Sequence, residues 1–227
     1  MRSIIVVVIV VDDLPSVVEN VTDRTSNPFG LRPPFDLTGP DERTAVFGYG
    51  DANADFHVVG DYPGVHGGRS TGVPFTETDA GLAVQGVLRE VGFADGPWDR
   101  PDLENCVCSY LHMNCLPDGE TPSEEAYADL ERYFDAELRA INAHVLLPVG
   151  RHAIDHVLRA YTTRRDRLDL DPAALHAREI RGRGFLVVPI RDPNAWRDTD
   201  REAIVARLEA ILERDYRQTK GVATMVG

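Results

Sequence analysis

The clearest structural signal in this chain is the stretch Phe56-His57-Val58-Val59-Gly60-Asp61-Tyr62-Pro63-Gly64. Its first half is a short apolar run closed by a glycine, which predicts a buried strand that ends at Gly60. A loop rich in glycine and proline follows to Thr78, and a helix is expected from Asp79, its N-cap, to about Val91. A strand, a loop and a helix in this order form the first unit of an alternating α/β fold.

The same alternation continues to the end of the chain. It predicts a three-layer α/β/α sandwich around a central, mostly parallel four-stranded sheet. In such sheets ligands bind beyond the carboxyl ends of the strands, so the loops at that edge are the candidate site. The further strands are expected at Cys106 to about Met113, His144–Val149 and Phe185–Ile190, and the further helices after Thr121, over Arg151–Tyr161 and after Thr199.

Two of the helix starts show the capping-box pattern, a hydroxyl residue followed three positions later by an acid. In the first, Thr121 is the expected cap, Pro122 fits the first turn and Glu124 is the acid; in the second, Glu202 completes the box after Thr199. The first helix also carries an apolar face that should pack on the sheet. This face consists of Leu130, Tyr133, Phe134, Leu138 and Ile141.

Length and composition describe a single globular domain. The chain has 227 residues, of which 43% are hydrophobic and 27% charged. Prolines break residues 12–44, so we expect an N-terminal extension and irregular segment over 1–43, a domain over 44–216 and a tail over 217–227. The formal net charge of −13, with Lys220 the one lysine, is typical of proteins from salt-accumulating microbes. It excludes a broad affinity for polyanions unless arginines gather on one face.

The cysteines and the N-terminus bear on location. Three cysteines within ten positions do not form a disulfide framework and favour a reducing compartment. The run Ile4–Val11 is too short to span a bilayer and lacks a cleavage site, so it is expected to be a strand or a loosely attached extension. These features predict a cytoplasmic monomer with no membrane contact.

A metal site is one possible use of Cys106, Cys108, His112 and Cys115. Strand alternation, however, places Cys115 on the face opposite to the other three, and the tight Cys-x-Cys spacing is not that of a zinc ribbon. Core cysteines are therefore favoured over a metal centre. The segment Gly48–Asn53 lacks the third glycine of a dinucleotide-binding loop and precedes a strand, which excludes that function as well.

Two polar residues stand at expected strand ends. Asp61 lies between a glycine and a rigid proline turn, which suits a carboxylate that stabilises or activates a substrate; an aspartate that merely caps a turn is the alternative. Asn114 carries an amide that can read the edge of a nucleobase, and a turn-forming asparagine is equally compatible with its position.

Arginines around the last strand are candidates for the basic face that DNA binding requires. Solvated arginines paired with neighbouring aspartates are the alternative interpretation. The residues concerned are Arg164, Arg165, Arg167, Arg178, Arg181, Arg183, Arg191 and Arg197.

Taken in order, several segments resemble the uracil-DNA glycosylase superfamily, in particular its thermostable, iron-sulfur branch. The resemblance covers roughly Arg43 to Leu212. It implies an enzyme of base excision repair that flips uracil or another deaminated base out of DNA and hydrolyses its N-glycosidic bond without a cofactor. The matching segments are Arg43–Asp55, Gly60–Gly64, Asn114–Glu125, Leu147–Ala153 and Arg181–Arg183.

The resemblance also implies roles for individual residues. Asp61 would act on the sugar cation or orient the attacking water, Phe75 would stack on the base, and Asn114 would bind its Watson–Crick edge. Tyr62 would exclude the methyl group of thymine. The catalytic residues would be Asp61, Asp192 and Asn194, the other substrate-binding residues Gly60, Pro63, Gly64 and Arg191, and the DNA contacts Arg151, Arg181 and Arg183.

The chain departs from the family pattern in three ways. Asp61 replaces a glutamate, which shortens its reach by about 1.5 Å and favours action through a water. An early Cys-x-x-Cys is missing around Asn27–Pro34 and the fourth cysteine near Asp129 or Leu130, so Cys115 alone matches and no cluster is expected.

The third departure affects the last motif, where His-Pro-Ser becomes Asp192-Pro193-Asn194. The family histidine stabilises negative charge on the departing uracil, whereas a carboxylate would repel it. Arg191 or Asn194 would then have to supply the donor. Two alternatives stay open: an inert DNA- or base-binding protein of the same fold, and a small metalloprotein.

Overall fold

The computed structural model describes residues 20–21, 45–162 and 170–216. Several predictions made from the sequence lie outside these ranges. They concern the strand or extension Ile4–Val11, the missing cysteine motif around Asn27–Pro34, the start of the resemblance at Arg43, the three arginines Arg164, Arg165 and Arg167, and the tail 217–227.

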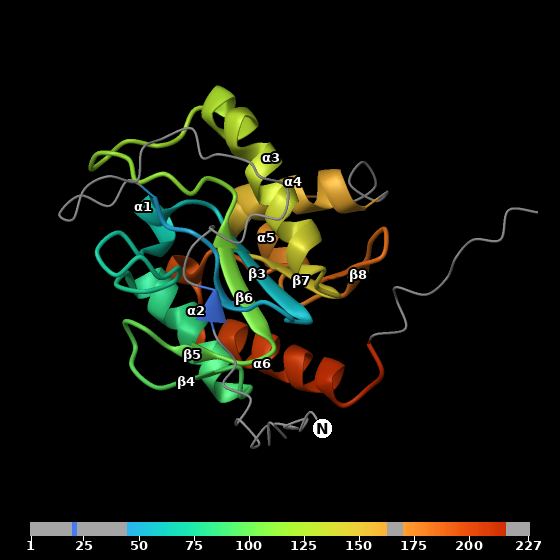
Figure 1. Cartoon of the computed structure of the whole chain (residues 1–227). Coiled ribbons are helices and arrows are strands. Elements are labelled where there is room, and N and C mark those ends of the chain that lie inside the picture. Colours follow the sequence, from blue (N-terminus) through green and yellow to red (C-terminus); the bar gives the residue numbers. More distant parts are fainter. Residues whose placement is uncertain (1–19, 22–44, 163–169, 217–227) are drawn as a thin grey trace, which may run out of the picture.

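The middle layer of the described structure is a seven-stranded sheet (Figure 1). Its four central strands run parallel, as predicted, and three strands at its edges pair antiparallel. These edge strands were not predicted. In spatial order the strands are β1 (Asn20–Val21), β2 (Tyr49–Asp51), β6 (Cys106–Tyr110), β3 (Phe56–Gly60), β7 (Val145–Pro148), β9 (Leu186–Val187) and β8 (Ile180–Arg181).

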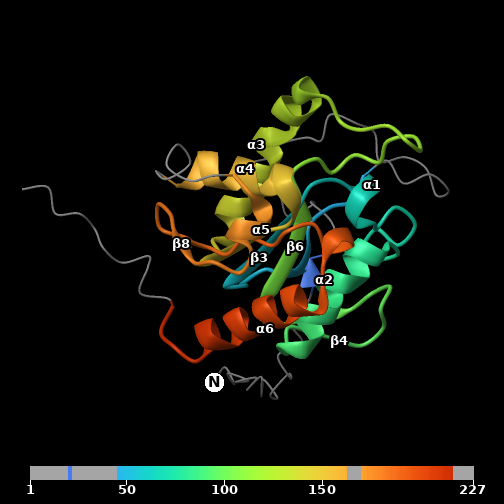
Figure 2. The ribbon, with the colours of Figure 1, turned by 180° about the vertical axis from the view of Figure 1, so that it is seen from behind.

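Helices cover both faces of the sheet, which confirms the three-layer sandwich (Figure 2). On one face, α2 (Asp79–Glu90) and α6 (Asp198–Leu212) enclose a core that includes Phe56 and Val58 of β3. On the other face, α3 (Glu124–Ile141), α4 (Gly150–Tyr161) and the short α5 (Pro172–Leu175) enclose a core that includes Val59. The remaining elements are α1 (Pro63–His66), the 3-10 turn η3 (Pro193–Ala195) and a hairpin of β4 (Ala94–Asp95) and β5 (Asp102–Leu103).

All three predicted helix caps were wrong. The Thr78 hydroxyl, not Asp79, caps α2 and accepts a hydrogen bond from the N–H of Gly81. Ser123, not Thr121, caps α3, because its hydroxyl lies 3.2 Å from the N–H of Ala126. At α6 the helix begins at Asp198, two residues earlier than predicted, with Arg197 rather than Thr199 at the N-cap.

The start of α6 is set by a carboxylate rather than a hydroxyl. Asp200 accepts the backbone N–H of Arg197 at 2.8 Å, a charge-assisted bond that fixes the first turn of the helix. Within α3, the predicted apolar face is buried except for Ile141, which is half-buried beside the helix end.

Three strands are shorter than predicted, and of these β7 lacks one residue at each end of the range His144–Val149. β6 ends at Tyr110, which pairs with Gly60, the last residue of β3; after it, the N–H groups of Leu111 and His112 donate to the carbonyls of Gly60 and Asp61. β9 ends at Val187, two residues before Pro189, which has no N–H to donate to a ladder.

The cysteines lie in or beside the core. Cys106 and Cys108 are buried, Cys115 is half-buried, and none of the three is in a disulfide bond. Within residues 20–21, 45–162 and 170–216, no group of three or more His, Cys, Asp or Glu side chains is placed to hold a metal ion. None of the helices in these ranges has the length and apolar character needed to cross a bilayer.

Candidate functional site

Asp61 stands at the carboxyl end of the central strand β3. The parallel register pairs Gly60 with Tyr110 and Val59 with Pro148, so the ends of three strands meet at one edge of the sheet. The Asp61 carboxylate is half-buried there and accepts a hydrogen bond from the Tyr127 hydroxyl of α3. The Tyr127 ring in turn stacks on His152 of α4, with ring centroids 4.1 Å apart. Two helices of the same layer thus fix the orientation of the acid.

The environment of Asp61 changes its acidity. Burial raises the pKa of the Asp61 carboxyl, while the Tyr127 hydrogen bond and the neighbouring His152 oppose that rise. The carboxylate therefore holds a proton more readily than an ordinary aspartate and is a suitable general base.

A cavity of about 600 Å³ opens beside this carboxylate, a size that suits a small ligand. Its wall is built from the loops after β3, β7 and β9, the edge at which ligands bind in parallel sheets. The lining residues are Asp61, Val65, His66, Gly150, Arg151, His152, Asp155, Leu170, Pro172 and Asp192.

His66 is a site residue that the sequence reasoning missed. Its Nδ1 accepts the backbone N–H of Asp61 at 3.1 Å, and its side chain is 1% exposed. Burial lowers the pKa of His66 to about 4, although the charge of Asp192 favours protonation. The imidazole is therefore neutral at physiological pH.

Tyr127 and His152 were missed for a different reason. Tyr127 lies seven residues before Phe134 and so shares its face of α3, a spacing that was available in the sequence. Its bond to Asp61, however, joins residues 66 positions apart. Only the packing of α3 on the sheet brings the two side chains together.

Asp192 lines the cavity, as its place in the last motif suggested. Its Oδ1 accepts the backbone N–H of Asn194 at 2.9 Å, which caps the turn η3. Asn194 itself is exposed and is not among the lining residues.

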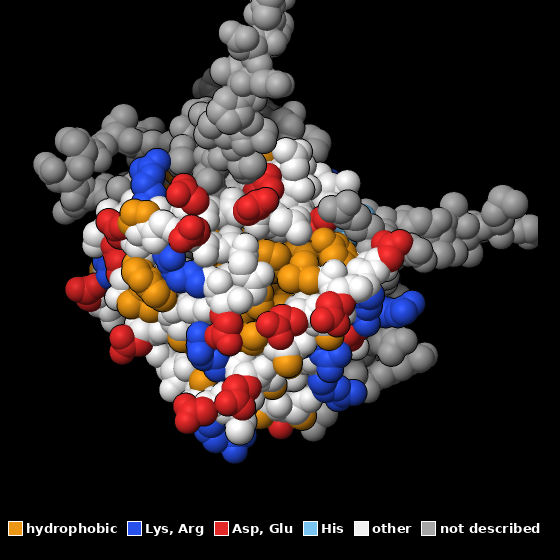
Figure 3. Space-filling view, turned by 90° about the horizontal axis from the view of Figure 1, so that it is seen from below, with side chains coloured by type: hydrophobic (Ala, Val, Ile, Leu, Met, Phe, Trp, Pro, Cys, Tyr) orange, Lys and Arg blue, Asp and Glu red, His pale blue; other side chains and the backbone are white. Residues whose placement is uncertain are grey.

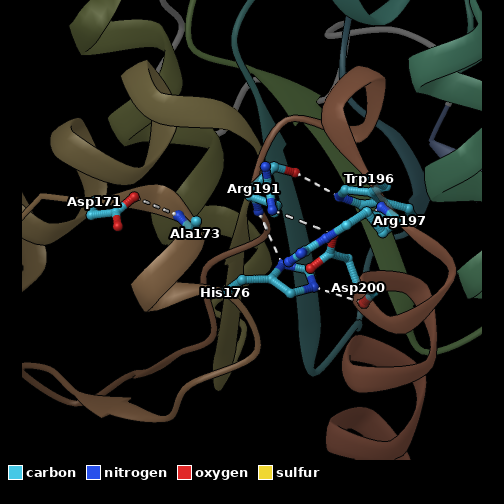
Figure 4. Close-up of polar contacts among 7 residues, drawn as sticks. All are labelled: Asp171, Ala173, His176, Arg191, Trp196, Arg197 and Asp200. Atoms are coloured by element: carbon cyan, nitrogen blue, oxygen red, sulfur yellow. Dashed lines mark hydrogen bonds and ion pairs between the residues drawn. The ribbon is translucent and has the colours of Figure 1, made fainter.

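Arg191 points toward Asp200 of α6 (Figure 4) and is not among the residues that line the cavity. Its guanidinium lies 3.4 Å from the Asp200 carboxylate, and its backbone N–H donates to His176 Nδ1 at 3.1 Å. Trp196 Nε1 donates to its carbonyl at 2.9 Å. These contacts give Arg191 a structural role at the start of α6.

Phe75 and Asn114 also lie outside the lining of this cavity. The Phe75 ring is fully buried, 5.3 Å from His66 and 5.5 Å from Tyr110 between ring centroids. Asn114 is half-buried, and its Oδ1 is enclosed without a hydrogen-bond partner among the described residues. An unsatisfied amide oxygen of this kind is available to a ligand donor.

The glycines of the Gly60–Gly64 segment are required by close packing. A Cβ on Gly60 would lie 2.7 Å from the Tyr110 ring, and one on Gly64 would lie 2.4 Å from the Tyr62 ring. Pro63 occupies the first turn of α1. Tyr62 and Gly64 line a second, smaller cavity of about 170 Å³.

The three predicted DNA contacts do not lie together. Arg151 is exposed at the start of α4 and lines the cavity. Arg181 and Arg183 belong to the hairpin before β9, at the opposite edge of the sheet, where the N–H of Arg183 bonds to Tyr161 at the far end of α4. The length of that helix, about 18 Å, separates the two places (Figure 1).

The charges on the face seen from below are mixed (Figure 3). Acidic and basic side chains alternate there around apolar surface, so this face offers no continuous basic area. Several other arginines are paired with acids, for example Arg201 with Glu90 at 2.6 Å and Arg207 with Glu179 at 3.0 Å. Of the arginines singled out in the sequence, Arg191 and Arg197 pair with Asp200, at 3.4 Å and 3.5 Å, as the alternative interpretation expects.

Comparisons with known proteins agree with the resemblance seen in the sequence. The family model described as uracil DNA glycosylase superfamily matches residues 47–212. A type-5 uracil-DNA glycosylase of Thermus thermophilus is 30% identical over 124 residues, which cover 53% of this chain and 57% of that protein. One of Pyrobaculum aerophilum is 29% identical over 115 residues, 49% of this chain and 51% of that protein.

The alignments thus span little more than half the length of each of these relatives. The family match, in contrast, extends from Phe47, before β2, to Leu212, the last residue of α6. It includes every strand end that contributes to the cavity. The chain therefore belongs to the uracil-DNA glycosylase superfamily.

Proposed function

We propose that this protein is a DNA glycosylase that hydrolyses the N-glycosidic bond of uracil or another deaminated base. The observation that carries the proposal is the half-buried Asp61 carboxylate, held by Tyr127 at the edge of a cavity large enough for a base. Membership of the superfamily gives this geometry its chemical context.

The reaction needs a water molecule, a carboxylate and an extruded nucleotide. As the bond between C1′ and the base nitrogen breaks, both electrons leave with the base and the sugar becomes a cation. Asp61 stabilises that cation and accepts a proton from the water that attacks C1′. The products are the free base and an abasic site. The raised pKa of Asp61 suits proton acceptance.

The DNA contact that fits this site is Arg151, which is exposed at the cavity and has no ion pair within the described ranges. One cation gives a weak electrostatic contribution, and a net charge of −13 opposes the approach of DNA at low salt. Salt screens that repulsion. We therefore expect a smaller loss of binding with added salt than for a basic DNA-binding protein.

Single-turnover release of a labelled base tests the proposal. The substrates are an oligonucleotide with one uracil, single-stranded or opposite guanine, at low and at molar salt. We expect free uracil and an alkali-labile site. Binding without release under every condition would instead identify an inert base-binding protein, an outcome that the carboxylate of Asp192 in the cavity specifically favours.

Removal of the Tyr127 hydroxyl should reduce the catalytic contribution of Asp61 without abolishing it. In Tyr127→Phe the carboxylate loses a hydrogen bond that favours its ionised form, worth about 1 kcal/mol, or about fivefold in rate. The pKa of Asp61 then rises further, so activity is lost at a higher pH as the solution is acidified.

A pH profile of base release checks this expectation. The acidic limb of the pH profile of Tyr127→Phe should lie at a higher pH than that of the unmodified protein. Tyr161→Phe is the matched control, because Tyr161 donates in the same way to Asp135 but lines neither Asp61 nor its cavity. An unshifted acidic limb in Tyr127→Phe would remove Tyr127 from the site.

A further inference from the structure

The last motif of this chain presents a carboxylate to the cavity, at a place where a departing base anion needs a hydrogen-bond donor. We propose that His66 supplies this donor, with its Nε2–H bonded to the carbonyl oxygen of the base that gains negative charge. The inference rests on the proposed function and adds a catalytic residue to it.

The tautomer of His66 is set by the backbone. The N–H of Asp61 donates to Nδ1 at 3.1 Å, so in the neutral ring the proton is carried by Nε2. The short helix α1 connects the two residues and ends at Gly67, which has a φ of +87°. A Cβ on Gly67 would lie 1.6 Å from the carbonyl oxygen of Thr76. This close approach of two backbone segments fixes the backbone next to His66.

The ring stays neutral because it is buried. His66 packs against Phe75 and Tyr110, and this environment lowers its pKa to about 4. A neutral imidazole keeps its Nε2 proton through the reaction, so it can strengthen a hydrogen bond as charge develops on the base. The nearby carboxylate of Asp192 opposes the lowering of the pKa but does not reverse it.

The Nε2 side of the ring faces the cavity. A Cβ on Gly150 would lie 4.0 Å from Nε2 and 3.9 Å from Cε1, and Gly150 and Asp192 line the same cavity as His66. The part of the chain that the structure describes provides no hydrogen-bond acceptor for this N–H. The Nε2–H group is therefore free for a ligand. Through the hydrogen bond at Nδ1, the ring is also joined to the backbone of Asp61, the residue that carries the catalytic carboxylate.

The other candidate donors are placed less well. Arg191 is bound to Asp200 and to His176, and Asn194 is exposed outside the cavity lining. His152 does line the cavity, but it stacks on Tyr127 at the Asp61 side and is exposed.

The proposed step balances without a further reactant. The bond from C1′ to the base nitrogen breaks with both electrons passing to the base, and the charge is shared with the carbonyl oxygen that accepts from Nε2–H. Water supplies the hydroxyl group to C1′ and its proton passes to Asp61; after release the base anion takes a proton from solvent, and Asp61 returns its proton to solvent. His66 ends the cycle unchanged.

The test compares two bases with different stability as anions. Oligonucleotides with uracil or 5-fluorouracil are used, because fluorine stabilises the departing anion and reduces the need for a donor. We expect His66→Ala to slow uracil release about 10²-fold and 5-fluorouracil release much less. His66→Gln keeps an N–H donor, so its rate of uracil release should lie between those of the unmodified protein and His66→Ala. It also tests the donor role if the alanine variant does not fold.

His176→Gln is the matched control. His176 Nδ1 also accepts a backbone N–H at 3.1 Å, but its Nε2 contacts the carbonyl of Asp200 and it does not line the cavity. Its release rates should remain within about twofold of the unmodified protein, well below the effect of losing a donor. Asp192→His added to His66→Ala should restore most of the lost rate.

The outcomes separate this inference from the function on which it rests. If the unmodified protein releases uracil and folded His66 variants slow both bases equally or not at all, the donor role is wrong and the glycosylase function stands. If the unmodified protein and Asp192→His both bind DNA and release neither base, the function and the donor role fail together.

Discussion

Substitution of Asp61 by asparagine is expected to lower the single-turnover rate of base release by about 10³-fold, which corresponds to about 4 kcal/mol of transition-state stabilisation. Asparagine has the same shape as aspartate and keeps an oxygen that can accept from Tyr127, so the local structure should persist. What disappears is the negative charge that stabilises the sugar cation and accepts the proton of the water.

The control for this variant is Asp118→Asn. Asp118 is also an aspartate in a loop beyond a strand, but it is exposed, pairs with Arg69 and does not line the Asp61 cavity. Its rate should equal that of the unmodified protein. A rate for Asp61→Asn within a few-fold of the control would show that the reaction does not depend on this carboxylate.

The second large effect is an increase in rate. Asp192→Asn removes a negative charge from the cavity in which the base anion forms, and we expect about a tenfold faster release at low salt. An asparagine oxygen can still accept the N–H of Asn194, so the cap of η3 is kept. The measurement is the same release assay, repeated at molar salt, where the gain should shrink.

Asp198→Asn provides the comparison for Asp192→Asn. Asp198 is an exposed aspartate at the start of α6, a few residues along the same segment, and it does not line the cavity. Neutralising it changes the net charge by the same amount. If both variants accelerate release equally, the effect comes from the overall charge of the protein and not from the place of Asp192.

The sequence predicted the parallel centre of the fold because its strands are apolar runs with clear ends. β3 ends at Gly60, as expected, and this places Asp61 at the ligand-binding edge. The edge strands β1, β2 and β8 are only two or three residues long; β1 and β2 pair with neighbours far along the chain, and β8 forms a short hairpin with β9. No local pattern identifies such strands.

The candidate site likewise contains residues that the sequence identified and residues that it did not. Asp61 and Asp192 were found because they occupy recognisable positions in short motifs. Tyr127 and His152 come from α3 and α4 and reach the site only through packing, whereas His66 lies five residues from Asp61 in the short helix α1 and contacts it locally. The sequence did not predict that Arg181 and Arg183 lie at the other end of α4 from Arg151, because motif order says nothing about which edge of a sheet a hairpin occupies.

The most direct test of the account is the intact mass of a uracil-containing oligonucleotide after incubation with the protein and with Asp61→Asn. We expect the unmodified protein to replace the base with a hydroxyl group and leave an intact strand with an abasic site. Asp61→Asn should leave the mass unchanged on the same time scale. An unchanged mass with both proteins, at low and at molar salt, would contradict the assignment of this cavity to glycosidic bond hydrolysis.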